Sequence, residues 1–75
     1  MSSMEYAVIY AKTRSGYSAH VPDLPGCIAT GRTLALTQRR MREAIHLHLK
    51  GMREDGDRIP RPTTLAEQIE VVDAA

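Results

Sequence analysis

Polar and apolar residues alternate over a short segment that begins at Tyr17. Tyr17, Ala19 and Val21 are separated by polar residues, and this period of two is typical of a β-strand with one buried face. Pro22 follows and ends the strand, because its nitrogen carries no hydrogen to donate. An earlier segment, Glu5–Lys12, has a central part, Tyr6–Ala11, that is apolar on both of its faces. It predicts a strand that is covered on both sides.

A turn rich in proline and glycine connects the Tyr17 strand to a third one. Pro25 presets its own φ, and Gly26 can adopt the positive φ that a type II turn requires at the next position. Cys27–Thr30 then predicts a short third strand. The polar segment Thr13–Gly16 suits a hairpin connection between the first two strands. The three strands should therefore form an antiparallel meander.

The hydrophobic period changes to that of an α-helix after Gly31. Thr33 is a suitable N-cap, and Gly56 suits the left-handed position that follows a helix ending near Asp55. Gly51 interrupts the helix and should cost about 1 kcal/mol relative to alanine. One stripe of side chains should face the core. It holds Leu34, Met41, Ile45 and Met52, flanked by Ala44, His48 and Leu49.

Two leucines of this helix lie off the core stripe. Leu36 and Leu47 are separated by three helical turns, so they share the outer face of the helix. They are either isolated surface leucines, which are common in soluble proteins, or part of an interface with a second chain. The pattern alone favours neither interpretation.

The residues after the helix predict one more strand. Ile59–Pro62 is an extended connector, and Thr64–Glu67 fits a capping box for one helical turn. Ile69–Val72 then predicts a last strand that returns to the sheet. The order β-β-β-α-β defines one α+β domain over residues 1–75, with a long helix on one face of the sheet.

The other face of the sheet and the small size of the chain both predict self-association. We expect Tyr6, Val8 and Tyr10 on the face away from the helix, where a partner subunit would cover them. A chain of 75 residues buries only roughly 60% of its unfolded surface. Small domains often need further stabilisation by a disulfide, a metal or oligomerisation. The single cysteine excludes an internal disulfide, and no cluster suggests a metal. We therefore expect a homodimer or a larger homo-oligomer.

Charge and hydropathy indicate where in the cell the protein is located and which partners it is expected to bind. Ten basic and nine acidic residues give a net charge of +1, which argues against nucleic-acid binding by bulk charge. The segment Met1–Met4 has neither the charged nor the apolar region of a signal peptide. No apolar run approaches the ~20 residues that span a bilayer. A lone cysteine fits a reducing cytoplasm, where we expect the protein.

No arrangement of residues predicts catalysis. Nucleases with a ribonuclease-H-like fold hold two metals with clustered carboxylates. Here only Glu5 lies near the first strand and only Asp23 in the turn, and the remaining acidic residues lie in the helix or beyond it. His46 and His48 project too far apart around the helix to share a metal. We therefore expect no enzyme activity, no cofactor and no metal.

Three features keep two interpretations each. His20 could approach Cys27 across the hairpin as a base and nucleophile, or Cys27 is simply a small core residue. Asp23 either caps its own turn through backbone N–H groups or is presented to a basic partner. The arginine-rich segment Arg39–Arg42 is either a solvated helix face or a set of phosphate contacts.

The sequence Gly-Tyr-Ser-Ala-His-Val-Pro-Asp-Leu-Pro-Gly-Cys, residues 16–27, resembles the signature of HicB-type antitoxins and their stand-alone relatives. The resemblance covers nearly the whole chain and implies the family fold, a partial ribonuclease-H-like β-β-β-α-β arrangement. Its other matching residues are Gly31, Thr33, Glu43-Ala44-Ile45, Glu54-Asp55-Gly56 and Ile59-Pro60.

The resemblance also implies a function. Proteins of this kind neutralise a small HicA-like toxin that cuts messenger RNA and has a double-stranded-RNA-binding fold, and they do no chemistry themselves. Many carry a C-terminal DNA-binding module, for which the chain leaves no room after Ala75; this counts against operator binding. The residues expected to meet a basic toxin are Asp23, Leu24, Pro25 and Glu5. The residues expected at an oligomer interface are Tyr6, Val8, Tyr10, Leu36 and Leu47.

Two other functions remain open. The first is an orphan HicB-like domain that only self-associates, with a scaffold or regulatory role. The second is a nucleic-acid binder that uses the arginine-rich helix face in a symmetric dimer, whose binding would fall steeply with salt.

Overall fold

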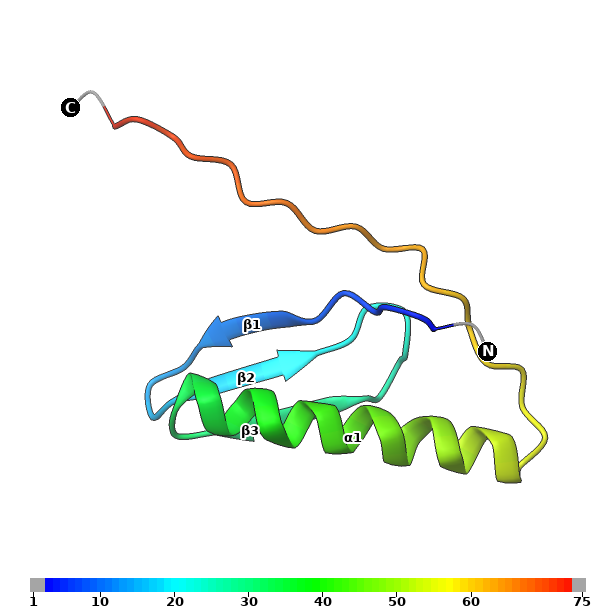
Figure 1. Cartoon of the computed structure of the whole chain (residues 1–75). Helices are drawn as coiled ribbons and strands as arrows, with labels where there is room; N and C mark the ends of the chain where they lie inside the picture. The colour runs from blue at the N-terminus through cyan, green and yellow to red at the C-terminus, as the bar shows by residue number, and fades with distance from the viewer. Residues whose placement is uncertain (1–2, 74–75) are drawn as a thin grey trace.

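Three short strands and one long helix form the folded body of the protein, as the computed structural model shows (Figure 1). The structure describes residues 3–73. The sheet is antiparallel with the order β1-β2-β3, so each strand pairs with its neighbour in the sequence, and α1 runs along one face of it. The elements are β1 (Ile9–Lys12), β2 (Tyr17–His20), β3 (Ile28–Gly31) and α1 (Leu34–Glu54). The predicted meander and the helix on one face are therefore confirmed.

The strand register decides which residues face the helix. Tyr10 lies opposite Ala19, and Ala19 lies opposite Ala29. Residues that lie directly opposite each other point to the same face of a sheet. Ala19 is buried, and Tyr10 and Ala29 pack against the same core, so this row faces α1.

This register corrects the predicted placement of three aromatic and aliphatic side chains. Tyr6, Val8 and Tyr10 were expected on the face away from the helix, and this expectation is wrong. All three are partly buried against the core on the helix side. The alternation of β1 could not identify its inner face because both faces are apolar. The open face instead carries the cross-strand row Ile9, His20 and Ile28.

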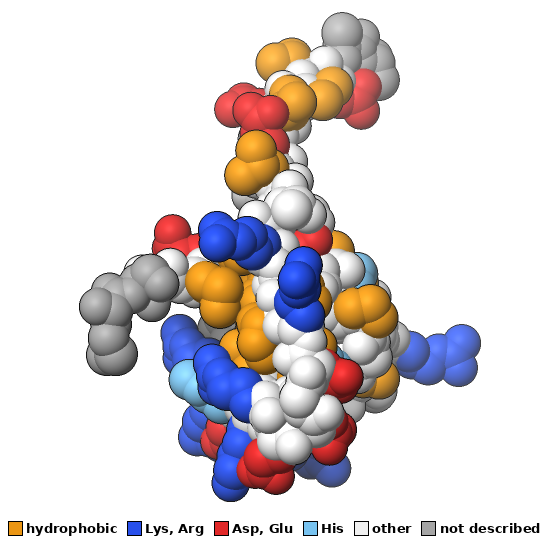
Figure 2. All heavy atoms as spheres, turned by 90° about the vertical axis from the view of Figure 1, so that its right-hand side faces the viewer, with side chains coloured by type: hydrophobic (Ala, Val, Ile, Leu, Met, Phe, Trp, Pro, Cys, Tyr) orange, Lys and Arg blue, Asp and Glu red, His pale blue; other side chains and the backbone are white. Residues whose placement is uncertain are grey.

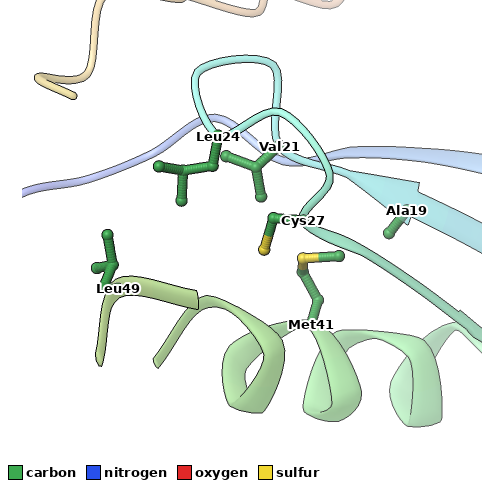
Figure 3. Close-up of a cluster of buried hydrophobic side chains, with 6 residues drawn as sticks. All are labelled: Ala19, Val21, Leu24, Cys27, Met41 and Leu49. Atoms are coloured by element: carbon green, nitrogen blue, oxygen red, sulfur yellow. The ribbon is translucent and has the colours of Figure 1, made fainter. Parts of the chain in front are cut away.

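The core lies between the sheet, the loop before β3 and the middle of α1 (Figure 3). Its buried apolar residues are Ala19, Val21, Leu24, Cys27, Met41 and Leu49. The predicted helix stripe is only partly correct. Leu34 is 39% exposed, whereas Thr37 is fully buried and donates its hydroxyl to the Thr33 carbonyl at 2.8 Å. A Cβ at Gly31 would lie 2.7 Å from Thr37 Oγ1, so the close approach of β3 to the helix needs glycine there.

Both ends of α1 are capped as the sequence predicts. Thr33 Oγ1 accepts a hydrogen bond from the Leu36 N–H at 3.1 Å, while the first turn holds no acidic residue. At the other end Gly56 has φ of 74° and donates its N–H to the Arg53 carbonyl at 3.2 Å. Asp57 N–H donates to the Met52 carbonyl at 2.8 Å. This pair of bonds is a Schellman motif.

The segment after the helix departs most from the prediction. Neither the helical turn at Thr64–Glu67 nor the strand at Ile69–Val72 forms, and the described chain from residue 57 onward contains no regular element. Residues 65–73, which we call the C-terminal arm, extend past β1 and away from the body (Figure 1). A strand needs a neighbour to pair with, and the sheet holds only β1 to β3. The returning strand is therefore not formed.

Candidate partner-binding surface

The loop before β3 is built from two consecutive tight turns. Leu24 N–H donates to the Val21 carbonyl at 3.0 Å, and Cys27 N–H donates to the Leu24 carbonyl at 3.0 Å. Gly26 has φ of 86°, as expected for the third position of a type II turn after Pro25. Val21 N–H also donates to the Cys27 carbonyl at 3.2 Å, which closes the base of the loop.

Leu24 and Pro25 point in different directions from this loop. Leu24 is completely buried and points into the core (Figure 3). The loop uses this leucine as an anchor in the core, and a contact between Leu24 and a partner stays a prediction. Pro25, the next residue, is exposed. Leu24 thus anchors the loop in the core, and Pro25 is exposed to solvent on its outer side.

Asp23 holds the chain that leads to the C-terminal arm. Its Oδ2 accepts the N–H groups of Thr63 at 2.9 Å and Thr64 at 3.0 Å. Its Oδ1 accepts the two threonine hydroxyls, at 3.0 Å from Thr63 and 2.8 Å from Thr64. These bonds, led by the one from the Thr64 N–H, lower the pKa of Asp23 to about 2 because they favour the charged carboxylate. Asp23 therefore caps a distant segment rather than its own turn.

A tyrosine makes a second attachment near the first. The Tyr6 hydroxyl donates to the Pro60 carbonyl. Burial raises the pKa of Tyr6, the negative charge of Asp23 raises it further, and Arg53 lowers it, so the hydroxyl stays protonated and can donate. Glu5, the neighbouring residue, is exposed.

A groove lies beside the exposed side of the loop, where it meets the C-terminal half of α1. Its volume is about 460 Å³. It is lined by Leu24, Pro25, Leu47, His48, Gly51, Met52, Asp55, Asp57 and Pro60. Gly51 is one of the lining residues, and a Cβ at this position would meet nothing within 4 Å. The sequence did not reveal this groove, although Gly51 within a predicted helix was a signal of it.

The groove has an apolar centre and acidic residues at one end. Leu47 is 68% exposed, and together with Pro25 it gives the groove apolar walls. Asp55 and Asp57 follow at the end of the helix, where both are exposed. Figure 2 views the molecule from the side of this helix end and shows apolar, acidic and basic side chains next to one another.

The structure separates the remaining predicted residues. Leu36 is half-buried and packs close to Gly31, so it does not share an exposed face with Leu47. Glu5 is not among the residues that line the groove. Arg40 donates from Nη1 to the Thr30 carbonyl at 2.9 Å, which ties this arginine to the end of β3. The oligomer interface expected at Tyr6, Val8, Tyr10, Leu36 and Leu47 stays a prediction.

The geometry does not support a catalytic pair of His20 and Cys27. His20 lies on the open face of the sheet opposite Ile28, whereas Cys27 is buried in the core, and this burial raises the pKa of its thiol. Within residues 3–73 no group of three or more histidine, cysteine or acidic side chains could hold a metal ion. A search of the same residues finds no helix with the length and apolarity to cross a membrane.

A three-stranded antiparallel meander followed by one long helix, with a proline- and glycine-rich loop before the third strand, defines a small α+β domain of the HicB type. The comparisons agree. Residues 6–74 match the family described as the HicB-like antitoxin of bacterial toxin–antitoxin systems. The chain belongs to this family.

Individual relatives show how far the similarity extends. A protein encoded in the rep-hol intergenic region of Haemophilus phage HP1 is 36% identical over 66 residues, which are 88% of this chain and 50% of that protein. The chain thus spans half the length of this phage relative. A UPF0150 protein of Thermoplasma acidophilum is 36% identical over 69 residues, 91% of this chain and 97% of that protein.

A solved structure matches the fold as well as the sequence. It is a chain of a HicA3 and HicB3 toxin–antitoxin complex, with a TM-score of 0.69 and 28% identity. The match covers 79% of this chain and 70% of that chain. The similarity therefore extends over most of both chains.

Proposed function

We propose that this protein is the antitoxin of a toxin–antitoxin pair and that it neutralises a small HicA-like toxin by direct contact. The observation that carries the proposal is the structural match to a chain of a HicA3 and HicB3 complex, at a TM-score of 0.69, together with the family match over residues 6–74. In this function the protein does no chemistry. It occupies the surface with which the toxin would cut messenger RNA.

The groove beside the Pro22–Gly26 loop is the proposed contact surface. Leu47 and Pro25 offer apolar area that is already exposed, and apolar anchors near the centre of a contact usually carry most of the binding energy. Asp55 and Asp57 stand at its end. An RNA-cutting toxin is expected to be basic, so these acidic residues would speed its association and orient it.

Leu24 and Asp23 have a supporting role in this proposal. Leu24 anchors the loop in the core, and Asp23 attaches the loop to Thr63 and Thr64. Because both are committed within the chain, they hold Pro25 in place rather than contact the toxin. A rigid loop loses little conformational freedom on binding, and this favours affinity.

The test is a binding and inhibition experiment with a purified HicA-like toxin from the same genome. Calorimetry would give the Kd, and cleavage of a reporter messenger RNA would report neutralisation. The wild-type protein should bind and inhibit. Leu47→Asp should weaken binding at least about tenfold, since it places a charge in an apolar contact. Leu34→Asp, an equally drastic change at a 39% exposed position of the same helix outside the groove, is the matched control.

The possible failures are distinct. No binding by a wild-type protein that is folded by circular dichroism would overturn the antitoxin function for that toxin. Binding and inhibition that are equally sensitive to both substitutions, or to neither, would retain the function and overturn the groove as the contact surface.

A further inference from the structure

Within residues 3–73 the C-terminal arm carries half of the exposed large apolar side chains and all of those that are grouped closely in the sequence. Their exposed fractions are 97% for Leu65, 74% for Ile69, 82% for Val71 and 83% for Val72. Within the folded body such exposure is limited to single residues, for example Ile28 and Leu47. Four exposed apolar residues within eight positions are not expected of a segment that remains in water.

The composition of the arm is also not that of a disordered tail. Its composition from Leu65 to Val72 includes three β-branched residues and neither proline nor glycine. Such residues favour strands. Its root is fixed at Thr63 and Thr64 by the four hydrogen bonds to Asp23, so the arm leaves the body from one defined point.

The sheet has a free edge at β1 (Ile9–Lys12). β1 pairs only with β2, so its outer edge presents unpaired N–H and C=O groups, which can template another strand. The chain's own arm passes this edge without pairing. Ala66, Glu67 and Gln68 are separated from residues 8–10 by a hollow of about 560 Å³, and the arm diverges further beyond it (Figure 1).

We propose that the arm adds as a fourth strand to β1 of a second copy of this chain, and that the second copy returns its arm in the same way. A symmetric exchange uses both arms and both free edges at once, and such exchange of identical elements is a common route to dimers. The charges of the arm and of the β1 edge are complementary. From Thr63 to Asp73 the arm carries three acidic residues and no basic one, while Lys12 and Arg14 lie at the end of β1.

The direction of the arm favours a second copy over the chain's own edge. The arm runs past β1 and away from the folded body (Figure 1). Ile69, Val71 and Val72 are 74%, 82% and 83% exposed, so they are not packed on their own core. Exchange would bury them and would supply the extra core that a chain of this size needs. The inference does not depend on the proposed toxin.

The first experiment measures mass in solution by size-exclusion chromatography with light scattering, using the full chain without any toxin. The wild type should have twice the mass of one chain. The double substitution Ile69→Glu and Val71→Glu should have the mass of one chain, with its helix content unchanged by circular dichroism. Ala66→Glu with Gln68→Glu adds the same charge at neighbouring arm positions that are not large apolar residues, and it should stay a dimer.

The second experiment distinguishes exchange from other arrangements. A dimer of one 13C-labelled and one unlabelled chain should show nuclear Overhauser contacts between the arm of one copy and β1 of the other. A wild type with the mass of one chain overturns the proposal. So does a dimer that survives the Ile69 and Val71 substitutions, or one whose arm contacts only its own β1. An arm that pairs only when a toxin is added overturns it as well.

Discussion

Asp23 and Thr64 are 41 residues apart in the sequence, yet one carboxylate joins them through two hydrogen bonds, 3.0 Å from the Thr64 N–H and 2.8 Å from its hydroxyl. Thr63 adds two more bonds to the same carboxylate. Four donors thus converge on one half-buried side chain. The predicted capping box at Thr64 fails for this reason, because the threonine that would start a helical turn is already bonded to Asp23.

Asp23→Asn should loosen the chain between the helix and the arm. The amide keeps one acceptor oxygen but turns an NH₂ group toward the Thr63 and Thr64 donors. We expect a lower Tm and faster proteolysis near Arg58 and Arg61, measured by limited trypsin digestion. Glu5→Gln, which neutralises an exposed acid that makes none of these hydrogen bonds to Thr63 and Thr64, is the control and should digest like the wild type. Equal digestion of all three would contradict the role of Asp23.

The same carboxylate predicts a pH dependence in acid. Its pKa falls from 3.8 to about 2 on folding, so the unfolded state binds the proton more tightly. The contribution of Asp23 to stability is therefore fully present above about pH 4 and is lost as the pH falls toward 2. Urea unfolding followed across this window should show a loss of stability in the wild type that is smaller in Asp23→Asn. Identical pH profiles would show that the carboxylate does not contribute.

Gly51→Ala should separate stability from binding. A Cβ at this position meets nothing within 4 Å, and alanine favours a helix by about 1 kcal/mol over glycine. We expect Tm to rise by roughly 4–8 °C for a domain of this size. The added methyl also enters the groove, so the affinity for a toxin that uses the groove should fall. Stabilisation with unchanged toxin affinity would place the contact elsewhere.

Leu24→Ala should be far more damaging than the same change at Leu47. Leu24 is completely buried, whereas Leu47 is 68% exposed. Truncating a buried leucine costs about 2–5 kcal/mol, a large part of the stability of a small domain, while the Leu47 change should be close to neutral. Urea denaturation of both variants gives the comparison. Equal losses would mean that the loop does not depend on its leucine.

Local patterns were sufficient to predict the elements of the folded body and their order. The alternation of Tyr17, Ala19 and Val21 identified β2, and Thr33 and Gly56 identified the two ends of the helix. Gly26 identified the type of turn. Each of these features depends on residues close together in the sequence, where backbone preferences and hydrogen bonds are determined by immediate neighbours.

Contacts between distant residues could not be predicted in the same way. The inner face of β1 depends on its register with β2, and both of its faces are apolar. The partner of Asp23 lies 40 residues away at Thr63. The strand expected at Ile69–Val72 has suitable residues, but a strand also requires a neighbour, which the sequence pattern does not supply. Leu34 was expected in the core, but Thr37 is buried instead. The reason is that the helix approaches β3 closely at Gly31, where Thr37 lies against the glycine.

The neighbour-to-neighbour order of the sheet bears on the time course of folding. Each strand pairs with the next one in the chain, and α1 follows β3 almost directly. Proteins dominated by such nearby contacts fold fast. The link from Asp23 to Thr63 closes one of the longest loops in the molecule, and long loops close at a greater entropic cost. We expect the sheet and helix to form first and the arm to be attached last. The arm would therefore bind its partner only after the folded body of that partner is complete.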